Sequence, residues 1–404
     1  MKPAVVLSTH TTGLGIIRSL GQHGVPIVAV YYGKSDMGYV SKYVKDKVLA
    51  PHPEKSENQF VNLLIDTAKR YSNSILIPAD DATLVAVSKN KTILANHYIV
   101  ACTDWAIAQR FIDKKYTYDI AESVGIPTPK TIVPQNISDA KKYSKSADYP
   151  CLVKPCQSHR YAELFGRKLL KVRNAGELMS AYKQAFEAGM DVLLQEYIVG
   201  EDSDGVNYNS YYWNSESLVE FTAQKVRLSP PDSGVPSVVI SKHIPEVLLQ
   251  GRKMLQALGF NGYSCIEFKK DTRDGTYKLL EVNGRHNRSL LLSVKCGINF
   301  PLIEYNHLVR GAIPSPTTYR TGVYWIDFTK DLCAIIQYRR KAKLSLIQFI
   351  KPYIKSHTFA VLCIKDIMPF IKRCICILGM ALEIIFKSKK QQRQSQTIQL
   401  EENG

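Results

Sequence analysis

The sequence contains no uninterrupted apolar run of the roughly 18 residues that a membrane-spanning helix needs. Its nine cysteines include no Cys-x-x-Cys pair, which argues against a thiolate metal site and favours reduced thiols. The opening residues, MKPAVVLSTH, lack the apolar segment and the cleavage site of a signal peptide. We therefore expect a cytoplasmic protein.

Acidic residues are scarce relative to basic ones: 36 Asp and Glu stand against 53 Lys and Arg, which gives a net charge of +17. Chains this basic commonly bind anions such as nucleic acid, phosphorylated ligands or acidic membranes. Residues 331–404 hold 13 of the basic side chains and only five acids, so this tail supplies almost half of the net charge. The preceding 330 residues are mildly basic and contain no nucleic-acid-binding motif, so we expect no nucleic-acid partner.

Short apolar strands and amphipathic helices alternate through the first 110 residues. This alternation predicts a parallel, doubly wound α/β domain. Gly13 and Gly15 suggest a dinucleotide-binding fingerprint, but its third glycine position holds Arg18, where a small residue should let helix and strand approach each other. NAD binding is therefore disfavoured.

A helix over residues 104–125 is followed by the Pro-punctuated segment 126–134, a pattern typical of a domain joint. Beyond this joint the apolar patterns predict a second, α+β region. Its expected strands lie at residues 149–155, 191–200, 217–228 and 263–270, and its expected helices lie at 176–189 and 245–259.

The segment 263–283 predicts a β-hairpin, because it contains the strong turn signal Asp274-Gly275. If the loop is centred on this turn, Glu267 faces Glu281, and side-chain alternation puts Asn283 on the same face. Like charges that oppose each other directly destabilise a strand pair, and a hard cation such as Mg²⁺ would remove the repulsion. The alternative is another register, in which one of the two Glu side chains points to solvent.

Two further strand ends carry polar groups. Lys154 ends an apolar strand just before Pro155, which presents its ammonium as a point charge for phosphate oxygens, although a strand-end lysine in water is the more common case. Another apolar strand stops at Gly200 and turns acidic at Glu201 and Asp202. Its terminal backbone groups suit an adenine edge, and an acid beyond the turn suits ribose hydroxyls, yet many strands end in this way.

In their order along the chain, these segments resemble the ATP-grasp superfamily. The segments that carry the resemblance are DKK…GIPTP, YPCLVKP, LLQEYIVGED, QKVRL, CIEFKK and LLEVNGR. More narrowly, the chain resembles the carboxylate–amine ligase-like branch often found with cell-surface polysaccharide genes. The resemblance covers residues 1–310. It implies a Rossmann-like preface domain (1–110), an ATP-grasp domain whose two α+β subdomains grip ATP (111–320), and a basic, helical C-terminal extension (321–404).

The resemblance also assigns roles by position. The residues implied to contact the phosphates of ATP are Lys114 and Lys154. Those implied to line its adenine and ribose are Gln195, Glu196, Tyr197, Ile198, Val199 and either Glu201 or Asp202. Those implied to bind Mg²⁺, or Mn²⁺ in its place, are Glu267, Glu281 and Asn283. Those implied to meet the γ-phosphate, the acyl phosphate or the substrate are Lys225, Arg227 and Arg285.

The activity implied is phosphoryl transfer from ATP to a carboxylate, followed by attack of an amine on the acyl phosphate. The partners would be a small-molecule carboxylate and an amine, in cell-surface polysaccharide or peptide modification. Many relatives close a glycine-rich loop over the phosphates, whereas this chain has one glycine there, Gly166, and the basic pair His159-Arg160. The alternative is an ATP-binding, membrane-docked scaffold that has lost its ligase chemistry; the intact pair of glutamates in the expected hairpin argues against this loss.

The tail contains an apolar stretch at residues 374–386, interrupted by Glu383 and flanked by Lys and Arg on both sides. This length and charge pattern suits an amphipathic helix that lies in an anionic membrane surface. The alternative is a C-terminal helix that packs on the protein body with its basic residues in water. The polar end, residues 387–404, is expected to be disordered.

Overall fold

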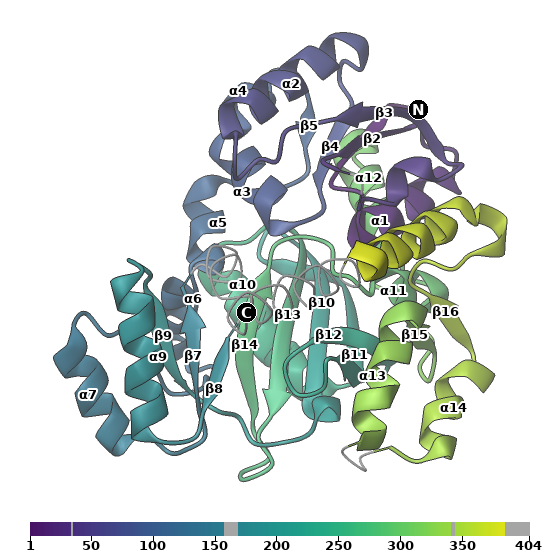
Figure 1. Cartoon of the computed structure of the whole chain (residues 1–404). Coiled ribbons are helices and arrows are strands. Elements are labelled where there is room, and N and C mark those ends of the chain that lie inside the picture. Colours follow the sequence, from purple (N-terminus) through teal and green to yellow (C-terminus); the bar gives the residue numbers. More distant parts are fainter. Residues whose placement is uncertain (34, 157–168, 341–343, 384–404) are drawn as a thin grey trace, which may run out of the picture.

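Three β-sheets organise the chain, and they follow one another along the sequence (Figure 1). The computed structural model describes residues 1–33, 35–156, 169–340 and 344–383. The loop with His159 and Arg160 and the polar end from residue 387 lie outside these described residues.

The first sheet is parallel, with the strand order β3-β2-β1-β4-β5, which confirms the predicted doubly wound domain. Helices cover both faces of its central strands, so these strands are short, fully buried apolar runs. Its strands are β1 (Ala4–Leu7), β2 (Ile27–Tyr31), β3 (Val44–Leu49), β4 (Ile75–Pro78) and β5 (Ile99–Val100). Its helices are α1 (Thr11–Gly21), the short η1 (Gly38–Val40), α2 (Glu57–Arg70), α3 (Asp81–Lys89) and α4 (Lys91–Leu94).

The segment expected as one helix over residues 104–125 forms two, α5 (Trp105–Ile112) and α6 (Lys114–Ser123). The break falls at Asp113, which has an extended backbone and accepts a hydrogen bond from the backbone N–H of Lys115. Asp113 therefore acts as the N-cap of α6. The consequence for the site is that Lys114 stands at the first position of a new helix.

The second sheet is small and antiparallel, with the order β6-β9-β7-β8. It packs against two helices through one apolar cluster and forms the lobe at the lower left of Figure 1. Its elements are β6 (Thr131–Ile132), α7 (Ile137–Ser146), β7 (Cys151–Pro155), β8 (Leu170–Val172), α9 (Ala175–Glu187) and β9 (Val192–Glu196).

The third sheet has seven strands in the order β14-β13-β10-β11-β12-β15-β16 and forms the centre of the molecule. One of its faces packs against α10 and α6, and the other packs against α11. Its strands are β10 (Gly205–Trp213), β11 (Glu216–Ser229), β12 (Val235–Ser241), β13 (Gly262–Lys270), β14 (Tyr277–Asn283), β15 (Tyr324–Ile326) and β16 (His357–Phe359). The associated helices are η2 (Asp202–Asp204), η3 (Pro245–Val247), α10 (Leu248–Leu258), α11 (Leu290–Cys296), α12 (Phe300–Arg310), α13 (Phe328–Arg340) and α14 (Leu346–Ile354).

The sequence suggested a separate C-terminal extension, but in the structure this region belongs to the central sheet. Its strands β15 and β16 continue the central sheet, because β15 pairs with β12 and β16 pairs with β15. The strands β15 (YWI) and β16 (HTF) have three residues each, which is too short for the two-residue alternation of a strand to be recognised between helical patterns. The expected boundary at residue 321 therefore cuts through a single sheet.

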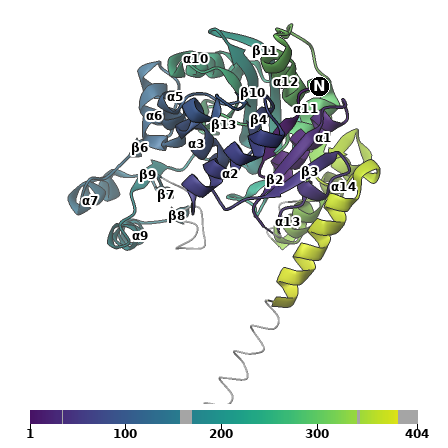
Figure 2. The same cartoon turned by 90° about the horizontal axis from the view of Figure 1, so that it is seen from above.

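The last described segment docks on the first domain through η4 (Ile364–Asp366). The buried carboxylate of Asp366 accepts hydrogen bonds from Arg18 Nε at 2.9 Å and Ser41 Oγ at 2.8 Å. Arg18 thus serves as an anchor in the place where a dinucleotide fingerprint would need a glycine. A helix follows from residue 368 and is described as far as residue 383; it runs beside α1 and then projects away from the body (Figures 1 and 2). No helix in the described ranges is long and apolar enough to cross a membrane.

Candidate active site

The hairpin of β13 and β14 has the register that the turn signal predicted. Glu267 pairs with Glu281, and Cys265 pairs with Asn283, so the three oxygen-bearing side chains share one face. The register shifts by one residue between Glu267 and Phe268, and this bulge produces the Glu267–Glu281 alignment, because the pairs nearer the turn, such as Lys269–Lys278, would put Glu267 opposite Leu280. Two carboxylates therefore oppose each other on the central sheet, as expected.

Each of these carboxylates is held by a lysine from a different element. Lys114, at the start of α6, places its Nζ 3.1 Å from Glu281 Oε1. Lys225, on β11, donates a hydrogen bond to Glu267 Oε2. Burial opposes ionisation of Lys114, Lys225 and Glu281, but the ion pairs outweigh it: Glu281 raises the pKa of Lys114 and Glu267 raises that of Lys225, while Lys114 lowers the pKa of Glu281.

Lys154 has a different environment, although it lies nearby. Its Nζ donates a hydrogen bond to Gln195 Oε1 at 2.6 Å, and Gln195 in turn donates to Thr131 Oγ1 at 2.8 Å. Burial, reinforced by the positive charge of Lys114, lowers the pKa of Lys154 to about 8. The small sheet thus presents a lysine of lowered pKa beside the charged Lys114, and an anion bound between the two would stabilise the charged form of both side chains.

The donor set fits a hard cation. Glu267, Glu281 and Asn283 offer oxygen atoms only, which Mg²⁺ prefers, and further ligands would come from phosphate and water. No group of three or more His, Cys, Asp or Glu side chains within the described residues is arranged to hold a metal, so the site depends on its amide oxygen. That oxygen, Asn283 Oδ1, accepts a hydrogen bond from Arg285 at 3.1 Å.

Arg285 joins this site to the first domain. Its Nε and one terminal nitrogen lie 2.7 and 3.0 Å from the two carboxylate oxygens of Asp81, the first residue of α3. Such a bidentate pair fixes the plane of the guanidinium. Sequence reasoning missed Asp81. The signal was available, since Asp81 follows β4 and the carboxyl ends of parallel strands are where doubly wound domains place ligand contacts.

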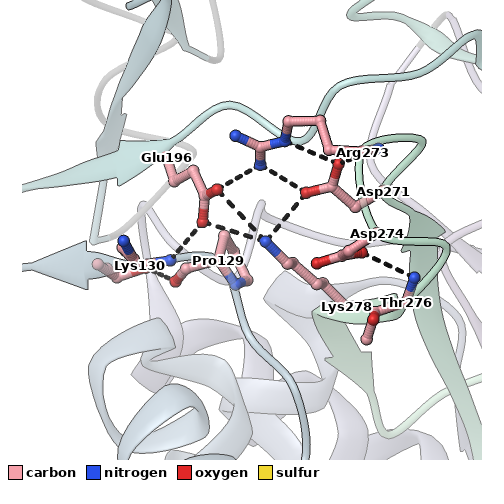
Figure 3. A network of polar contacts seen from close by, with 9 residues as sticks. Pro129, Lys130, Glu196, Asp271, Arg273, Asp274, Thr276 and Lys278 are labelled. Atoms are coloured by element: carbon pink, nitrogen blue, oxygen red, sulfur yellow. Dashed lines mark hydrogen bonds and ion pairs between the residues drawn. The ribbon is translucent and has the colours of Figure 1, made fainter. Parts of the chain in front are cut away.

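Glu196 ends β9 and anchors a network of polar contacts rather than standing open to a ligand (Figure 3). Its carboxylate accepts hydrogen bonds from the backbone N–H of Lys130 at 3.0 Å, from Arg273, and from Lys278 at 3.3 Å. Burial would raise the pKa of Glu196, but these donors hold it below its usual value. Arg273 and Lys278 also pair with Asp271, so the network ties the small sheet to the turn of the β13–β14 hairpin.

The segment after Glu196 crosses from the small sheet to the central one. The ring of Tyr197 lies under the ammonium of Lys171, 3.5 Å from the ring centroid, while Ile198 is buried. The carbonyl of Val199 accepts a hydrogen bond from the backbone N–H of Thr272 at 3.1 Å. This segment therefore forms a hinge, with its backbone close to both sheets.

The two candidate ribose acids differ in their surroundings. The Asp202 carboxylate accepts hydrogen bonds from the hydroxyl of Tyr338, on α13, and from the backbone N–H of Asp232 at 3.1 Å. Glu201, directly before it, is exposed and caps the short helix η2. Sequence reasoning left the choice between the two acids open.

Comparison with known proteins tests the interpretation of this site independently of its geometry. No family model matches the chain. A D-aspartate ligase from Enterococcus faecium (strain Aus0004) is 25% identical over 281 residues, 65% of this chain and 66% of that protein. A D-alanine–D-alanine ligase from Pseudomonas putida (strain GB-1) is 24% identical over 186 residues, 43% of this chain and 54% of that protein. The matches thus span between 54% and 66% of the length of these curated relatives.

Solved structures share the arrangement of domains. The biotin carboxylase domain of 2-oxoglutarate carboxylase from Hydrogenobacter thermophilus, in complex with MgADP, matches with a TM-score of 0.64 at 18% identity, over 80% of this chain and 73% of that one. An L-amino acid ligase from Bacillus licheniformis matches with a TM-score of 0.61 at 16% identity, over 77% of this chain and 74% of that one. The chain therefore has the ATP-grasp fold.

Within the ATP-grasp fold, the small sheet and the central sheet face each other across the cluster of Lys114, Lys154, Lys225, Glu267 and Glu281. Arg227 is the predicted site residue that the structure does not bring to this cluster. Its side chain is 1% exposed, and its guanidinium binds both carboxylate oxygens of Asp331 on α13, at 2.8 and 2.7 Å.

The displacement of Arg227 has a physical cause in its strand. The register of β11 with β12 shifts between Lys225 and Arg227, so the alternation that would put both side chains on one face is broken. The geometry gives Arg227 a buried structural ion pair rather than a place beside the phosphates.

Proposed function

We propose that the chain is an ADP-forming ligase that uses Mg²⁺ and ATP to join a carboxylate to an amine. The observation that carries the proposal is the pairing of Glu267 with Glu281 across the hairpin, with Lys114 and Lys225 on the two carboxylates. The ATP-grasp fold and the names of its relatives, D-aspartate ligase and D-alanine–D-alanine ligase, support the same reaction class.

In this proposal the lysines bind the triphosphate. Lys114 on α6 and Lys154 on β7 lie near each other and neutralise the phosphate oxygens. Glu267, Glu281 and Asn283 hold Mg²⁺, or Mn²⁺ in its place, which when bound neutralises the negative charge that the phosphates bring. The protein contributes mainly positioning and charge, since phosphoryl transfer needs little covalent help.

The reaction then proceeds on the substrates. A carboxylate oxygen attacks the γ-phosphorus of ATP, the bond to the β-phosphate oxygen breaks, and an acyl phosphate and ADP form. The amine attacks the acyl carbon, the C–O bond to phosphate breaks, and the amide forms with loss of a proton. Lys225 and Arg285 supply positive charge beside these steps, and no Ser or Cys nucleophile is required.

Glu201 and Asp202 both remain candidates for the ribose hydroxyls. The Asp202 carboxylate accepts hydrogen bonds from Tyr338 and Asp232, and Glu201 is exposed and caps η2. The adenine lies against the hinge of Tyr197, Ile198 and Val199. The contribution of Glu196 is then to fix this hinge through its network, and that of Gln195 is to orient Lys154.

Amino acids and sugar acids are the first substrates to test, because the resemblance is to ligases found with cell-surface polysaccharide genes and because D-aspartate ligase is among the relatives. Purified protein with Mg²⁺ and ATP is screened against pairs of carboxylates and amines, with ADP release as the readout. ADP release that depends on both substrates is the expected result. Tight ATP binding without turnover on any pair would favour the alternative of a scaffold that has lost its chemistry.

We further propose that the C-terminal helix contacts an anionic membrane surface. Its side chains Ile371, Ile375, Leu378 and Leu382 recur at helical spacing, and they are 41–64% exposed although they are apolar. The beginning of the helix packs on the body, where the ring of Phe370 meets Phe328. The rest projects away from the body (Figure 2), and the tail around it is strongly basic.

A point substitution tests this contact better than removal of the tail, because residues 331–404 include a strand of the central sheet. The double variant Leu378→Glu and Leu382→Glu is compared with wild type in flotation with vesicles of neutral and anionic lipid. We expect wild type to float with anionic vesicles and the variant to stay at the bottom. Leu249→Glu, an equally exposed leucine on α10, is the control and should float; equal flotation of all three proteins would contradict the contact.

A further inference from the structure

A cluster of three cations surrounds one buried carboxylate at the end of β15. Asp327, which is fully buried, accepts a hydrogen bond from Arg288 and lies 2.7 Å from a guanidinium nitrogen of Arg373. Lys330 stands one turn further on, at the start of α13, and its backbone N–H donates to the same carboxylate at 3.4 Å. None of these residues was singled out by the sequence.

The cluster is joined to the proposed active site through the loop after β14. This loop leaves the sheet at Asn283 and folds back across it, because Asn287 Nδ2 donates to Asn209 Oδ1 on β10 at 2.7 Å. Arg288 follows directly and reaches Asp327. Through β12, Trp325 on β15 is aligned with Lys225 on β11, since both residues pair with Val239. The two strands are two strand spacings, about 10 Å, apart, and Asp327 lies two residues beyond Trp325.

The charges in this cluster do not balance. Burial opposes ionisation of Asp327, but Arg288 and Arg373 hold its pKa below the usual range, so its single negative charge faces three positive groups. Burial, followed by the charges of Arg288 and Arg373, lowers the pKa of Lys330, and Lys330 has no ion pair with an acid in the part of the chain that the structure describes. An uncompensated positive charge in a half-buried place is costly unless an anion joins it.

Two details show where an anion would bind. The buried Nε of Arg288 has no hydrogen-bond partner among the described residues, although its terminal nitrogen binds Asp327. The Arg288 side chain as a whole is 27% exposed, although its Nε is buried, whereas the Asp327 side chain is closed off. A ligand can therefore meet the cations without displacing the carboxylate that orients them.

We propose that Arg288, Arg373 and Lys330 form a binding site for an oxyanion, a carboxylate or phosphate group carried by one of the substrates. This inference rests on the proposed ligase function, and it adds that a substrate bears a second anionic group besides the reacting carboxylate. Two guanidinium groups and an ammonium suit the several oxygens of such a group. Arg373 belongs to the C-terminal helix, so this helix supplies part of the substrate site.

Binding of small probes to the full chain tests the site without turnover. Malonate and inorganic phosphate are titrated by calorimetry at constant ionic strength, since the first represents a carboxylate source and the second a phosphate source. Lys330→Gln is the principal variant because the Lys330 side chain has no hydrogen bond or ion pair with the described residues, and Arg373→Gln is the second. Lys365→Gln, an exposed lysine in the same region, is the matched control for the loss of one charge.

We expect saturable binding of one or both probes to wild type, about tenfold weaker binding to Lys330→Gln and to Arg373→Gln, and unchanged binding to Lys365→Gln. MgATP affinity should stay within about twofold in all three variants, since none of these side chains belongs to the nucleotide site. No saturable binding of either probe, or an equal loss in the control, would overturn the proposal. Probe binding without ADP release on any substrate pair would overturn the ligase function and leave the oxyanion site standing.

Discussion

Lys114 and Glu281 form a 3.1 Å ion pair between the first residue of α6 and the central sheet. The pair joins the two groups that the proposal assigns to phosphate and to metal, so each neutralises the other in the nucleotide-free chain. Lys225 on β11 and Glu267 on β13 form a second such pair across the intervening strand β10. Under the proposed function, Mg²⁺ and ATP bound together would exchange these pairs, because the metal would replace the lysines on the carboxylates while the phosphates would replace the carboxylates on the lysines. Mg²⁺ alone would have to displace the lysines without compensation.

The first prediction follows from this exchange. Glu281→Gln should weaken ATP binding in the presence of Mg²⁺ by at least about tenfold, because an amide is a poorer Mg²⁺ ligand than a carboxylate. Binding of ATP without Mg²⁺ should change little or improve, since Lys114 is released from its partner. Calorimetric titration of ATP with and without Mg²⁺ measures both affinities.

The control for this substitution is Glu216→Gln, at the exposed start of β11. It removes the same charge far from the cluster and should bind Mg²⁺-ATP as wild type does. If Glu281→Gln keeps the Mg²⁺ dependence of wild type, the hairpin does not hold the metal. Mg²⁺ titrated alone into wild type should give no measurable heat of binding.

The second prediction concerns pH. The pKa of Lys154 is about 8 because burial and Lys114 disfavour its charged form. ATP affinity should therefore fall as the pH rises through about 8, and ATP binding above that pH should take up a proton. The free energy of unfolding should change in the opposite direction. Because the pKa of Lys154 in the folded chain lies below its ordinary value of 10.5, the unfolded chain binds more protons between pH 8 and 10.5, and the chain without nucleotide should become more stable over this range.

Lys154→Arg separates this effect from other titrations, because arginine stays charged throughout the range. Its ATP affinity should be flat between pH 7 and 9.5, and calorimetry in two buffers of different ionisation enthalpy should show no proton uptake. An unchanged pH profile in this variant would assign the titration to another group.

The sequence predicted the hairpin well and the C-terminal region poorly, and the reasons are physical. The turn signal placed the hairpin, and the predicted pair of Glu267 with Glu281 is present. The register beside the turn would put Glu267 opposite Leu280, so the pair also depends on the bulge between Glu267 and Phe268, which the sequence did not predict. The pairing of β15 with β12 joins residues far apart in the sequence, and no local pattern encodes it. The hydrogen bond between Arg18 and Asp366 also joins residues far apart in the sequence, so no local pattern predicts it.

Arg227 shows a second reason why sequence-based prediction failed. Alternation along a regular strand would put it on the face of Lys225, but a register shift between the two turns it away. Bulges leave a weak trace in sequence because they depend on the neighbouring strands. The partners of Glu196 were equally hidden, since Arg273 and Lys278 lie in and beyond a turn whose contacts with the small sheet are purely tertiary.

The third prediction tests the network around Glu196. Glu196→Gln keeps the shape but removes the charge that Arg273 and Lys278 share, and it should lower the free energy of unfolding at pH 7 by about 1–3 kcal/mol. Because the folded pKa of Glu196 is depressed, its contribution is present above its ordinary pKa and lost as the pH falls. The difference between wild type and variant should therefore shrink below about pH 4, as urea denaturation at several pH values would show.

Glu187→Gln, at the exposed end of α9, is the control and should unfold as wild type does at every pH. A constant difference between wild type and Glu196→Gln from pH 7 to pH 3 would mean that the substitution acts through packing rather than through charge. ATP affinity should also fall in Glu196→Gln, since the hinge beside the adenine loses its anchor.

The fourth prediction decides whether Arg227 is structural or acts on the substrate. Removal of one partner of a buried ion pair leaves an uncompensated charge and costs about 3–5 kcal/mol, so Arg227→Met and Asp331→Leu should each destabilise the chain by this amount. The double variant should cost much less than the sum, because neither charge then stays unpaired. Urea denaturation of the four proteins gives this coupling energy.

Activity gives the second readout for the same four proteins. If Arg227 only holds α13 against β11, the double variant should recover ATP affinity and turnover together with stability, because the contact that it replaces lies away from the cleft. If Arg227 instead contacts the γ-phosphate, turnover should stay low in Arg227→Met and in the double variant, while Asp331→Leu should retain it in the fraction that is folded. The burial of Arg227, at 1% exposure, favours the first outcome, since a side chain enclosed by Asp331 and Phe349 has no path to a phosphate without unfolding that contact.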